Sequence, residues 1–257
     1  MQPLTKGHYR ARLAGTQAEI RAAQRLRHIA FRPVTPPHAA ENSPAMDAAP
    51  LDADDFDTIC RHVLIEDLRD GALVGCFRGL GFGTGREIEA SYSAQFYDLS
   101  SLSRYGGRMI EIGRFCIHPQ RPDPDILRLA WAFLARHVAA QGIEMMFGCS
   151  SFNGTDKARY EDSFALLRAG HLAPAQWRPK IKAAQVYHFA ERVRHLPDRR
   201  KALQAMPPLL RTYLMMGGWV SDHAVIDKAL DRLHVFTGVE IRTIPEARRN
   251  LLLALAR

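Results

Sequence analysis

The sequence predicts a single domain, residues 1–257, of the mixed α/β class, with a central β-sheet flanked by helices. Residues 109–119 (MIEIGRFCIHP) have the pattern of a buried strand, residues 123–142 that of an amphipathic helix, and residues 143–149 (IEMMFGC) that of another buried strand. Strand, helix and strand at this spacing predict a βαβ unit. Residues 61–79 predict two further strands around Arg69-Asp70-Gly71, a tight hairpin turn in which Asp70 and Gly71 supply the positive φ angles. A sheet that contains both a parallel βαβ unit and an antiparallel hairpin is a mixed sheet.

The elements before and after this unit follow from local signals. Residues 8–15 (HYRARLAG) favour a strand, and Thr16 with Glu19 forms a capping box for a helix that ends before Pro33. Residues 33–52 are rich in proline, alanine and polar residues without periodicity, which predicts a mobile loop long enough to act as a lid. In the helix of residues 123–142, Asp123 is the expected N-cap, Pro124 lies in the first turn and Gly142 follows the end.

The remaining segments are less regular. GLGFGTG has glycines at alternate positions, but no periodic helix begins directly after it, so it predicts a loop rather than a nucleotide site, followed by a short helix near DLSSL. From Asp156 onward we expect a short helix, a basic strand-like stretch, a helical turn around PPLLRTYL and a strand at HVFTGVEI.

Composition limits the functional classes. With 257 residues, 47% of them hydrophobic, the chain can bury one large core or two small ones. It contains no apolar run of the roughly 18 residues that a spanning helix needs, and its first residues are too polar for a signal peptide. We therefore expect a cytoplasmic or peripheral protein. Four widely spaced cysteines in apolar segments predict reduced core residues and no metal site: Cys60, Cys76, Cys116 and Cys149.

The net charge of +8 and the pI of 9.6 favour an acidic partner, such as nucleic acid, anionic lipid or an acidic carrier protein. Much of this charge lies in the basic C-terminal portion, residues 178–201. This portion has neither a zinc-finger spacing nor the aromatic motif of an RNA-binding sheet, so no nucleic-acid partner is expected. A solvated basic face without a partner is the alternative.

The strongest chemical signal is a charge pair in the buried strand of residues 109–117. Glu111 and Arg114 flank Gly113 there, and burying charges is unfavourable unless they have partners or a chemical role. Strict alternation would direct the two side chains to opposite faces. A bulge at Gly113 would bring both toward one site and would free backbone groups for a ligand.

A set of charged residues recurs in a family-specific order. Arg27 with Phe31, then the aspartates of LDADDFD, then VGCFR ending at Arg78, then EIGRF, resembles the acyl-homoserine-lactone synthases, which have the GNAT N-acyltransferase fold. The closer resemblance is to the L-ornithine Nα-acyltransferases of bacterial ornithine-lipid synthesis. It covers almost the whole chain, through AAQRLRHIAF, DADDFDTICRHVLIED, SAQFYDLSSL, EIGRFCIHP, FGCSSFNGTD and PPLLRTYL with VIDKAL. The lactone synthases carry a tryptophan where this chain has Pro37, which argues against a lactone product.

The resemblance implies a GNAT-like splayed sheet and a reaction. A 3-hydroxyacyl chain would pass from acyl carrier protein to the α-amino group of L-ornithine, giving lyso-ornithine lipid. Ornithine has two amines and a carboxylate, so its site needs carboxylates and arginines. Attack on a thioester needs a neutral amine and hence a base, for which Glu111 is the candidate. The expected substrate-binding residues are Arg27, Phe31, Asp54, Asp57, Arg78 and Arg114, and the expected acyl-donor groove contains Gly113, Phe115, Ser150 and Ser151.

For the charged residues, an internal ion-pair network without a ligand is the alternative. The donor leaves its own signal, because CoA-dependent GNAT enzymes wrap the pyrophosphate with a glycine-containing loop at a helix start. Here residues 120–125 (QRPDPD) contain no glycine and two carboxylates, which would repel a pyrophosphate. We therefore expect the donor to be a phosphopantetheine arm delivered on acyl carrier protein, with no separate cofactor.

Two alternative functions stay open. One is acyl-homoserine-lactone synthesis from S-adenosylmethionine, and the other is a non-catalytic module that binds carrier protein or membrane. Transient contact of residues 178–201 with the anionic inner membrane is a further expectation, because the product is amphiphilic. Acyl chain length, oligomeric state and the choice between ornithine and lysine do not follow from the sequence, since one methylene is worth only about 1–3 kcal/mol.

Overall fold

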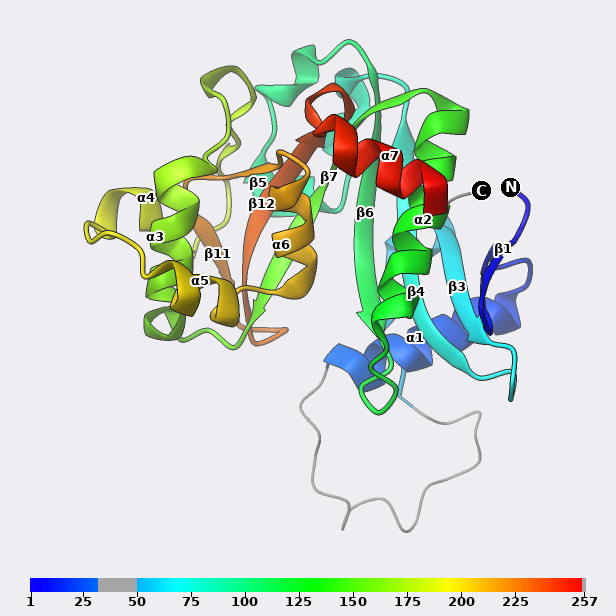
Figure 1. Ribbon diagram of the computed structural model, residues 1–257. Coiled ribbons are helices and arrows are strands. Elements are labelled where there is room, and N and C mark those ends of the chain that lie inside the picture. Colours follow the sequence, from blue (N-terminus) through cyan, green and yellow to red (C-terminus); the bar gives the residue numbers. More distant parts are fainter. Residues whose placement is uncertain (32–49, 256–257) are drawn as a thin grey trace, which may run out of the picture. The chain divides into compact units, whose positions relative to one another are not determined.

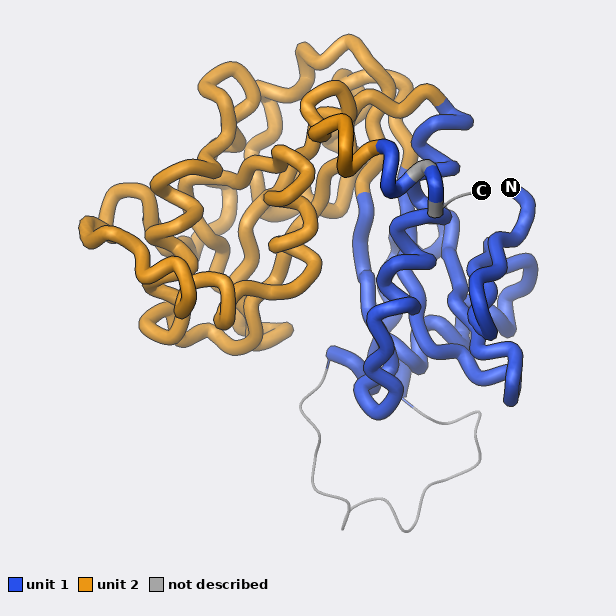
Figure 2. The backbone as a smooth tube through the Cα atoms, viewed as in Figure 1, with its two compact units in different colours: residues 1–80, 112–141, 250–257 blue, residues 81–111, 142–249 orange. Residues whose placement is uncertain are grey.

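The computed structural model describes residues 1–31 and 50–255, which belong to two compact units (Figures 1 and 2). Unit 1 comprises residues 1–80, 112–141 and the end of the chain from residue 250, and unit 2 comprises residues 81–111 and 142–249. The loop predicted at 33–52 lies outside the described residues except for its last three positions.

Unit 1 is a sheet with one helix on each face. The strands lie in the order β1 (Leu4–Lys6), β2 (Tyr9–Leu13), β3 (Arg61–Asp67), β4 (Leu73–Phe82) and β6 (Arg108–Ile117), and β1 to β4 pair antiparallel. Helix α1 (Gln17–Phe31) has the predicted capping box, with reciprocal bonds between Thr16 and Glu19. Helix α2 (Pro124–Gln141) begins after Asp123, whose carboxylate accepts the Asp125 N–H, and Gly142 follows it with φ +61°.

The alternation of side chains along the strands assigns the two helices of unit 1 to opposite faces. Ala23 and Leu26 of α1 form a buried cluster with Leu64, Cys76 and Cys116. Gly75, the neighbour of Cys76 on β4, faces the other way. A Cβ built there would lie 3.0 Å from Ile126 of α2, so the absence of a side chain at Gly75 lets α2 approach the sheet.

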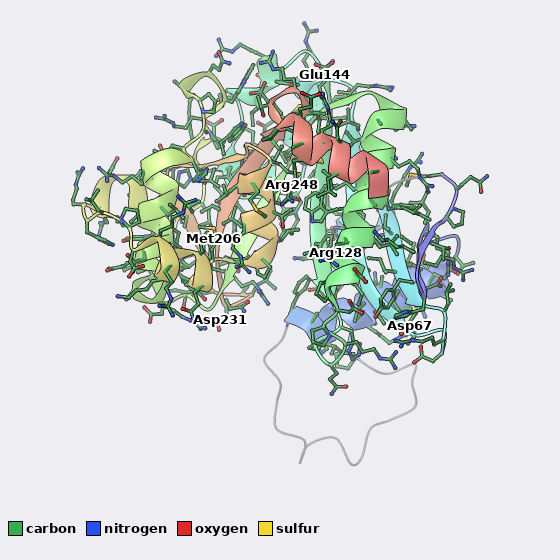
Figure 3. The ribbon with its side chains drawn as sticks, in the orientation of Figure 1. Asp67, Arg128, Glu144, Met206, Asp231 and Arg248 are labelled. Atoms are coloured by element: carbon green, nitrogen blue, oxygen red, sulfur yellow. The ribbon has the colours of Figure 1, made fainter. Side chains whose placement is uncertain are left out.

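The β3–β4 hairpin has the predicted position. Of its turn residues only Gly71 has a positive φ, +74°, so the expectation that Asp70 would share this conformation is wrong. Asp67, labelled in Figure 3, closes the turn instead: its carboxylate accepts hydrogen bonds from the backbone N–H and the guanidinium of Arg69. A side-chain bond across the turn thus replaces the second left-handed residue.

Unit 2 contains the rest of the strands. Residues 108–111 of β6 pair parallel with β7 (Ile143–Asn153), which confirms the βαβ unit. Beyond this pairing β6 passes into unit 1, whereas β7 continues in unit 2 and pairs antiparallel with β12 (Arg232–Glu240). The sheet continues through β11 (Ala224–Asp227) to β9 (Val186–Tyr187), while β10 (Trp219–Val220) pairs with β12, and β5 (Tyr97–Asp98) pairs separately with β8 (Lys180–Ile181).

The helices of unit 2 pack around aromatic residues. The α-helices are α3 (Glu161–Gly170), α4 (Phe189–Arg192), α5 (Arg199–Ala205), α6 (Pro208–Met215) and α7 (Glu246–Leu255), the last of which ends in unit 1. Short 3-10 helices are η3 (Asp55–Thr58, in unit 1), η4 (Gly85–Ala90), η5 (Ser93–Gln95), η6 (Leu102–Arg104), η7 (Lys157–Tyr160), η8 (Ala175–Trp177) and η9 (Ile241–Thr243). The core centres on Phe152, Phe164 and Phe189, all fully buried.

Two sequence expectations for unit 2 are wrong. The glycine-rich segment predicted as a loop begins inside β4, because Phe82 is buried against Phe147, with ring centroids 5.7 Å apart. The basic stretch is not one strand but β8, β9, α4 and the start of α5. Its buried residues explain this: Tyr187 and Phe189 are two positions apart, as in a strand, but Phe189 and Val193 are four apart, as in a helix.

All four cysteines are free thiols, as predicted, although only Cys76 and Cys116 are fully buried. The sulfur atoms of Cys76 and Cys116 lie 3.5 Å apart in unit 1. Of the helices in the described parts of the chain, none combines the length and the apolar character that crossing a membrane requires.

Candidate active site

A buried ion-pair network occupies unit 1 between α1, η3 and the sheet. At its centre the Arg27 guanidinium donates two parallel hydrogen bonds of 2.7 Å to the two carboxylate oxygens of Asp57. The Arg27 side chain is 1% exposed and that of Asp57 is 5% exposed, so water cannot replace either partner. Gln24 donates a further bond to Asp57. This bidentate geometry is the strongest that the two groups can form.

Arg78 of β4 extends the network toward the surface. One terminal nitrogen of Arg78 donates to both Asp57 and Asp54 at 2.5 Å, and the other donates to Asp54 at 2.8 Å. The side chain of Arg78 is 3% exposed, whereas that of Asp54 is 23% exposed. Asp54 therefore links the dry interior of the network to solvent.

Arg114 closes the exposed end. Its Nη2 donates to Asp54 at 2.9 Å, and its Nε lies 3.1 Å from Asp52. Arg27 contacts the same Asp52 oxygen at 3.0 Å. These two contacts with Asp52 are ion pairs without hydrogen-bond alignment. Three arginines thus face three aspartates, and this set of charges is balanced.

The backbone of β6 departs from a regular strand at this end of the network. The left-handed residue is Arg114, with φ +52°, and not Gly113, where the sequence predicted a bulge. This conformation costs roughly 1–2 kcal/mol for a residue with a side chain. A Cβ built on Gly113 would meet only Arg78 Nε, at 3.9 Å. The unusual backbone therefore lies at a residue bound to Asp52 and Asp54, beside a glycine with open space.

The network is held in its charged form. Burial acts to raise the pKa of Asp57, but the hydrogen bonds from Arg27 and Gln24 outweigh it and hold that pKa well below the usual range. Burial also acts against the charge of Asp54, and the bond and charge of Arg78 outweigh it, so the pKa of Asp54 is lowered. For Arg78, burial lowers the pKa and the two aspartates raise it above its usual value. All these groups are ionised at neutral pH.

The lowered pKa values of these aspartates predict that the fold is sensitive to acid. Asp54 and Asp57 have lower pKa values folded than unfolded, so at low pH the unfolded chain binds more protons and acid favours unfolding. Their contribution is complete well above about pH 4, the usual aspartate pKa, and is lost as pH falls below it. We expect the urea midpoint to drop between about pH 5 and pH 3, and to drop less steeply in Asp54→Asn. Parallel curves for the two proteins would contradict this assignment.

Glu111 lies in unit 2, on the part of β6 that pairs with β7. Glu111 is 5% exposed. Its carboxylate accepts three hydrogen bonds: from the backbone N–H of Tyr92 at 2.8 Å, from the backbone N–H of Ser93 at 2.8 Å and from the Ser93 hydroxyl at 2.6 Å. All three partners are donors, which suits an ionised carboxylate. The bonds also fix the start of η5. Glu111 is therefore both a positioned base candidate and an anchor of residues 92–95.

Unit 2 also contains buried polar groups that were not among the predicted site residues. Ser93 is fully buried and its hydroxyl lies 3.5 Å from the Cys149 sulfur. Elsewhere in unit 2, the Tyr97 hydroxyl donates to the backbone oxygen of His234 and lies 3.1 Å from its ring nitrogen. Burial lowers the pKa of His234 to about 4, so this imidazole is neutral. In the sequence, Ser93 and Tyr97 belong to the family motif SAQFYDLSSL, but this segment has no periodicity and reads as a loop.

The residues predicted for the acyl-donor groove are divided between the two units. In unit 1, Phe115 stacks on Phe77 with ring centroids 5.4 Å apart. In unit 2, Ser150 is buried on β7 and accepts a hydrogen bond from Thr237 of β12, while Ser151 is half-buried. Phe31, a predicted substrate contact, packs at the end of α1 against the cluster that includes Cys76. The network in unit 1 brings together Arg27, Asp54, Asp57, Arg78 and Arg114, and unit 2 holds Glu111, Ser150 and Ser151.

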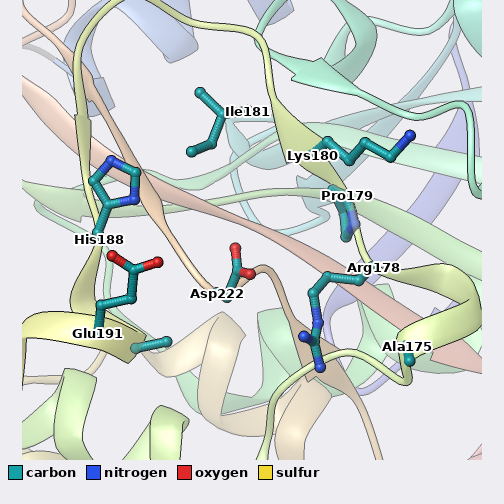
Figure 4. A pocket seen from close by; sticks show the side chains of 9 residues that line it. Ala175, Arg178, Pro179, Lys180, Ile181, His188, Glu191 and Asp222 are labelled. Atoms are coloured by element: carbon teal, nitrogen blue, oxygen red, sulfur yellow. The ribbon is translucent and has the colours of Figure 1, made fainter.

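A cavity of about 400 Å³ in unit 2 includes the start of the basic portion (Figure 4). Arg178, Lys180 and His188 line it, together with Glu191 and Asp222. In Figure 4 His188 and Glu191 lie on one side and Arg178 on the other, with Asp222 between them. The hydrogen bond from His223 lowers the pKa of Asp222, so its carboxylate is charged. Mixed charge makes this cavity a poor match for a phosphate group.

Comparison with known proteins identifies the fold and the family. Residues 26–132 match the acetyltransferase (GNAT) domain family, which confirms the predicted GNAT-like mixed α/β class. An L-ornithine N(alpha)-acyltransferase from Rhodobacter capsulatus is 34% identical over 94% of this chain and 93% of its own length. One from Brucella abortus is 32% identical over 93% and 86%. Among solved structures, an N-acyl amino acid synthase from uncultured soil microbes covers 91% of this chain and 92% of its own, at 10% identity and a TM-score of 0.49.

The two L-ornithine N(alpha)-acyltransferases align with nearly the whole chain, 94% and 93% of it. The chain is an acyltransferase, which decides against the non-catalytic binding module. The resemblance seen in the ordered sequence motifs is confirmed by the same relatives. The chain belongs to the family of the L-ornithine N(alpha)-acyltransferases.

Proposed function

We propose that this acyltransferase transfers a 3-hydroxyacyl chain from acyl carrier protein to the α-amino group of L-ornithine, giving lyso-ornithine lipid. The choice of L-ornithine as the acceptor is supported by the name of two relatives, L-ornithine N(alpha)-acyltransferase. They are 34% and 32% identical to this chain over more than nine tenths of its length. The proposal includes a cytoplasmic location, since carrier protein is the donor, and contact with the inner membrane that receives an amphiphilic product.

Asp54 and Arg114 are the proposed contacts for the acceptor within the network. The buried members, Arg27 and Asp57, already satisfy each other, so a ligand there would have to break two short bonds. Asp54 and Arg114 keep 23% and 15% of their side chains exposed. A carboxylate suits the ammonium groups of ornithine and a guanidinium suits its carboxylate. The buried members then act by holding the exposed pair in position.

Glu111 is the proposed base. The ammonium of ornithine must lose a proton before its nitrogen can attack the thioester carbon, and a carboxylate takes that proton directly or through one water. The new C–N bond forms as the C–S bond breaks, and the sulfur leaves as the thiol of the phosphopantetheine arm after taking up a proton. The two backbone N–H groups of residues 92 and 93 keep the carboxylate fixed throughout.

The start of α2 supports a carrier-protein donor over CoA. A helix N-terminus is a common anion site, and the resemblance to CoA-dependent GNAT enzymes would put a pyrophosphate at this one. Here the Asp123 carboxylate already accepts the Asp125 N–H and the Tyr9 hydroxyl, and Asp125 pairs with Arg128 at 2.7 Å. Two carboxylates at this end repel a pyrophosphate, whereas a carrier-protein arm brings a single phosphate.

The proposal is tested with the purified chain, 3-hydroxyacyl carrier protein or 3-hydroxyacyl-CoA, and ornithine, lysine or S-adenosylmethionine. We expect release of the carrier thiol with ornithine, an N-acyl-ornithine mass in the product, and a kcat/KM at least about tenfold lower with the CoA donor, a difference of roughly 1.4 kcal/mol. A lactone formed from S-adenosylmethionine would favour the alternative product. Equal rates with both donors would overturn the choice of carrier protein.

A further inference from the structure

Residues 192–201, here called the basic tip, form the connection from α4 into α5 in unit 2. This connection, yellow in Figure 1, extends away from the two helices. At its centre Leu196 is 90% exposed, more than any other large hydrophobic side chain among the described residues. A leucine that touches almost nothing in its own protein gains nothing from folding. It is a candidate for a partner that supplies an apolar environment.

Cations surround this leucine. The basic tip contains five, all exposed: Arg192, Arg194, Arg199, Arg200 and Lys201. Its one carboxylate, Asp198, is turned toward the start of α5, where it accepts the backbone N–H groups of residues 200 and 201. Asp198 also lies 3.7 Å from the Lys201 ammonium, and Asp162 of α3 faces the tip, so five cations against two carboxylates leave a net positive charge around Leu196. Cations around an apolar tip match a surface that is negative outside and apolar beneath, which describes an anionic bilayer.

The basic tip is held on both sides of Leu196. Before it, Val193 is 4% exposed in the core of unit 2 and donates its N–H to Phe189. The ring of His195, directly before Leu196, lies 3.5 Å from the Asp162 carboxylate of α3. After Leu196, the backbone N–H of Asp198 donates to the same carboxylate at 2.8 Å. Because these anchors fix the backbone, little conformational freedom remains to be lost when Leu196 enters an apolar phase.

We propose that the basic tip docks this enzyme on an anionic membrane surface, with the five cations at the lipid phosphates and the Leu196 side chain between the headgroups. A carrier protein is also acidic, but it would dock on a surface patch, whereas Leu196 projects with almost no apolar neighbour to form one. The proposal concerns where the enzyme works and does not depend on which acceptor it acylates.

Co-sedimentation with vesicles tests the proposal. We expect the full chain to bind vesicles of phosphatidylcholine mixed with an equal part of phosphatidylglycerol, to bind phosphatidylcholine alone much more weakly, and to be released by salt. Leu196→Ser should weaken binding to the mixed vesicles by about tenfold or more. The double variant Arg194→Gln/Arg200→Gln should weaken it by about 25-fold, since each cation near the surface contributes roughly fivefold.

Matched controls separate this site from general effects. Leu230→Ser changes another exposed leucine of unit 2, and Arg86→Gln/Arg104→Gln removes the same charge from exposed positions of that unit. Both should bind as the unchanged protein does. Equal binding by Leu196→Ser and Leu230→Ser, or equal binding to both kinds of vesicle, would overturn the proposal. So would tip variants that bind vesicles normally but lose turnover with carrier protein in solution, because the surface would then belong to the donor.

Discussion

Replacing Arg27 with methionine is expected to lower the free energy of unfolding by about 3–5 kcal/mol, the usual consequence of leaving a buried charge without its partner. Asp57 would lose both of its short bonds from α1 while its side chain stays 5% exposed. Asp52, whose backbone oxygen also accepts from Arg27, would lose a contact as well. Methionine keeps the unbranched stem of the side chain and ends before the guanidinium, so the measured loss reports mainly the charge and its bonds.

Urea unfolding followed by circular dichroism measures this loss, and Arg10→Met is the matched control. Arg10 also pairs with a carboxylate, Glu66, at 2.9 Å, but its side chain is 42% exposed, so the control should lose no more than about 1 kcal/mol. Comparable losses in the two variants would show that the network contributes no more than a surface pair. If Arg27→Met instead raised the KM for ornithine at unchanged stability, Arg27 would be a substrate contact.

Arg114→Met tests the other end of the same network. Its guanidinium is 15% exposed and lies at the edge, so we expect a stability loss nearer 1 kcal/mol and a marked rise in the KM for ornithine. Together the two variants separate a buried member that supports the site from an exposed member that binds the substrate. The charged residues would then have two roles: the exposed members would bind the substrate, and the buried members would form an internal ion-pair network that supports them.

The fold was predictable where local signals and burial agree. The capping box of Thr16 and Glu19, the buried strand before Asp123 and the glycine after α2 are each read within a few residues, and each is confirmed. The glycine-rich segment and the basic stretch were misread because their structure depends on distant partners. Phe82 becomes part of a strand only by packing on Phe147. No local pattern contains that contact.

The candidate site divides in the same way. Charged residues in apolar surroundings, such as Arg78 and Glu111, stand out in sequence because burying them requires a reason. Which charged residues pair does not follow from the sequence, since Arg27 and Asp57 are thirty positions apart and meet only through the fold. Ser93 stood out only as the first residue of the family motif SAQFYDLSSL, although its hydroxyl makes the shortest bond to Glu111. Sequence therefore indicates which residues need partners, and the structure identifies the partners.

Replacing Glu111 with glutamine is expected to lower kcat by about 10²–10⁴-fold, the range that general-base catalysis contributes. The amide cannot take the proton of the ornithine ammonium. The KM for ornithine should change little, since the proposed acceptor contacts are Asp54 and Arg114. The activity that remains should rise with pH more steeply than that of the unchanged enzyme, because at higher pH the solvent removes the proton instead.

Ser93→Ala distinguishes this role from that of an anchor. It removes the 2.6 Å bond to Glu111 but keeps the carboxylate and its two backbone donors. We expect about 1.5–3 kcal/mol of lost stability, as for other hydrogen bonds to charged groups, with activity within about tenfold of normal. If Glu111→Gln and Ser93→Ala lost activity equally, and neither recovered at high pH, Glu111 would act by fixing residues 92–95. A large kcat loss confined to Glu111→Gln and relieved by pH requires the carboxylate itself to take the proton.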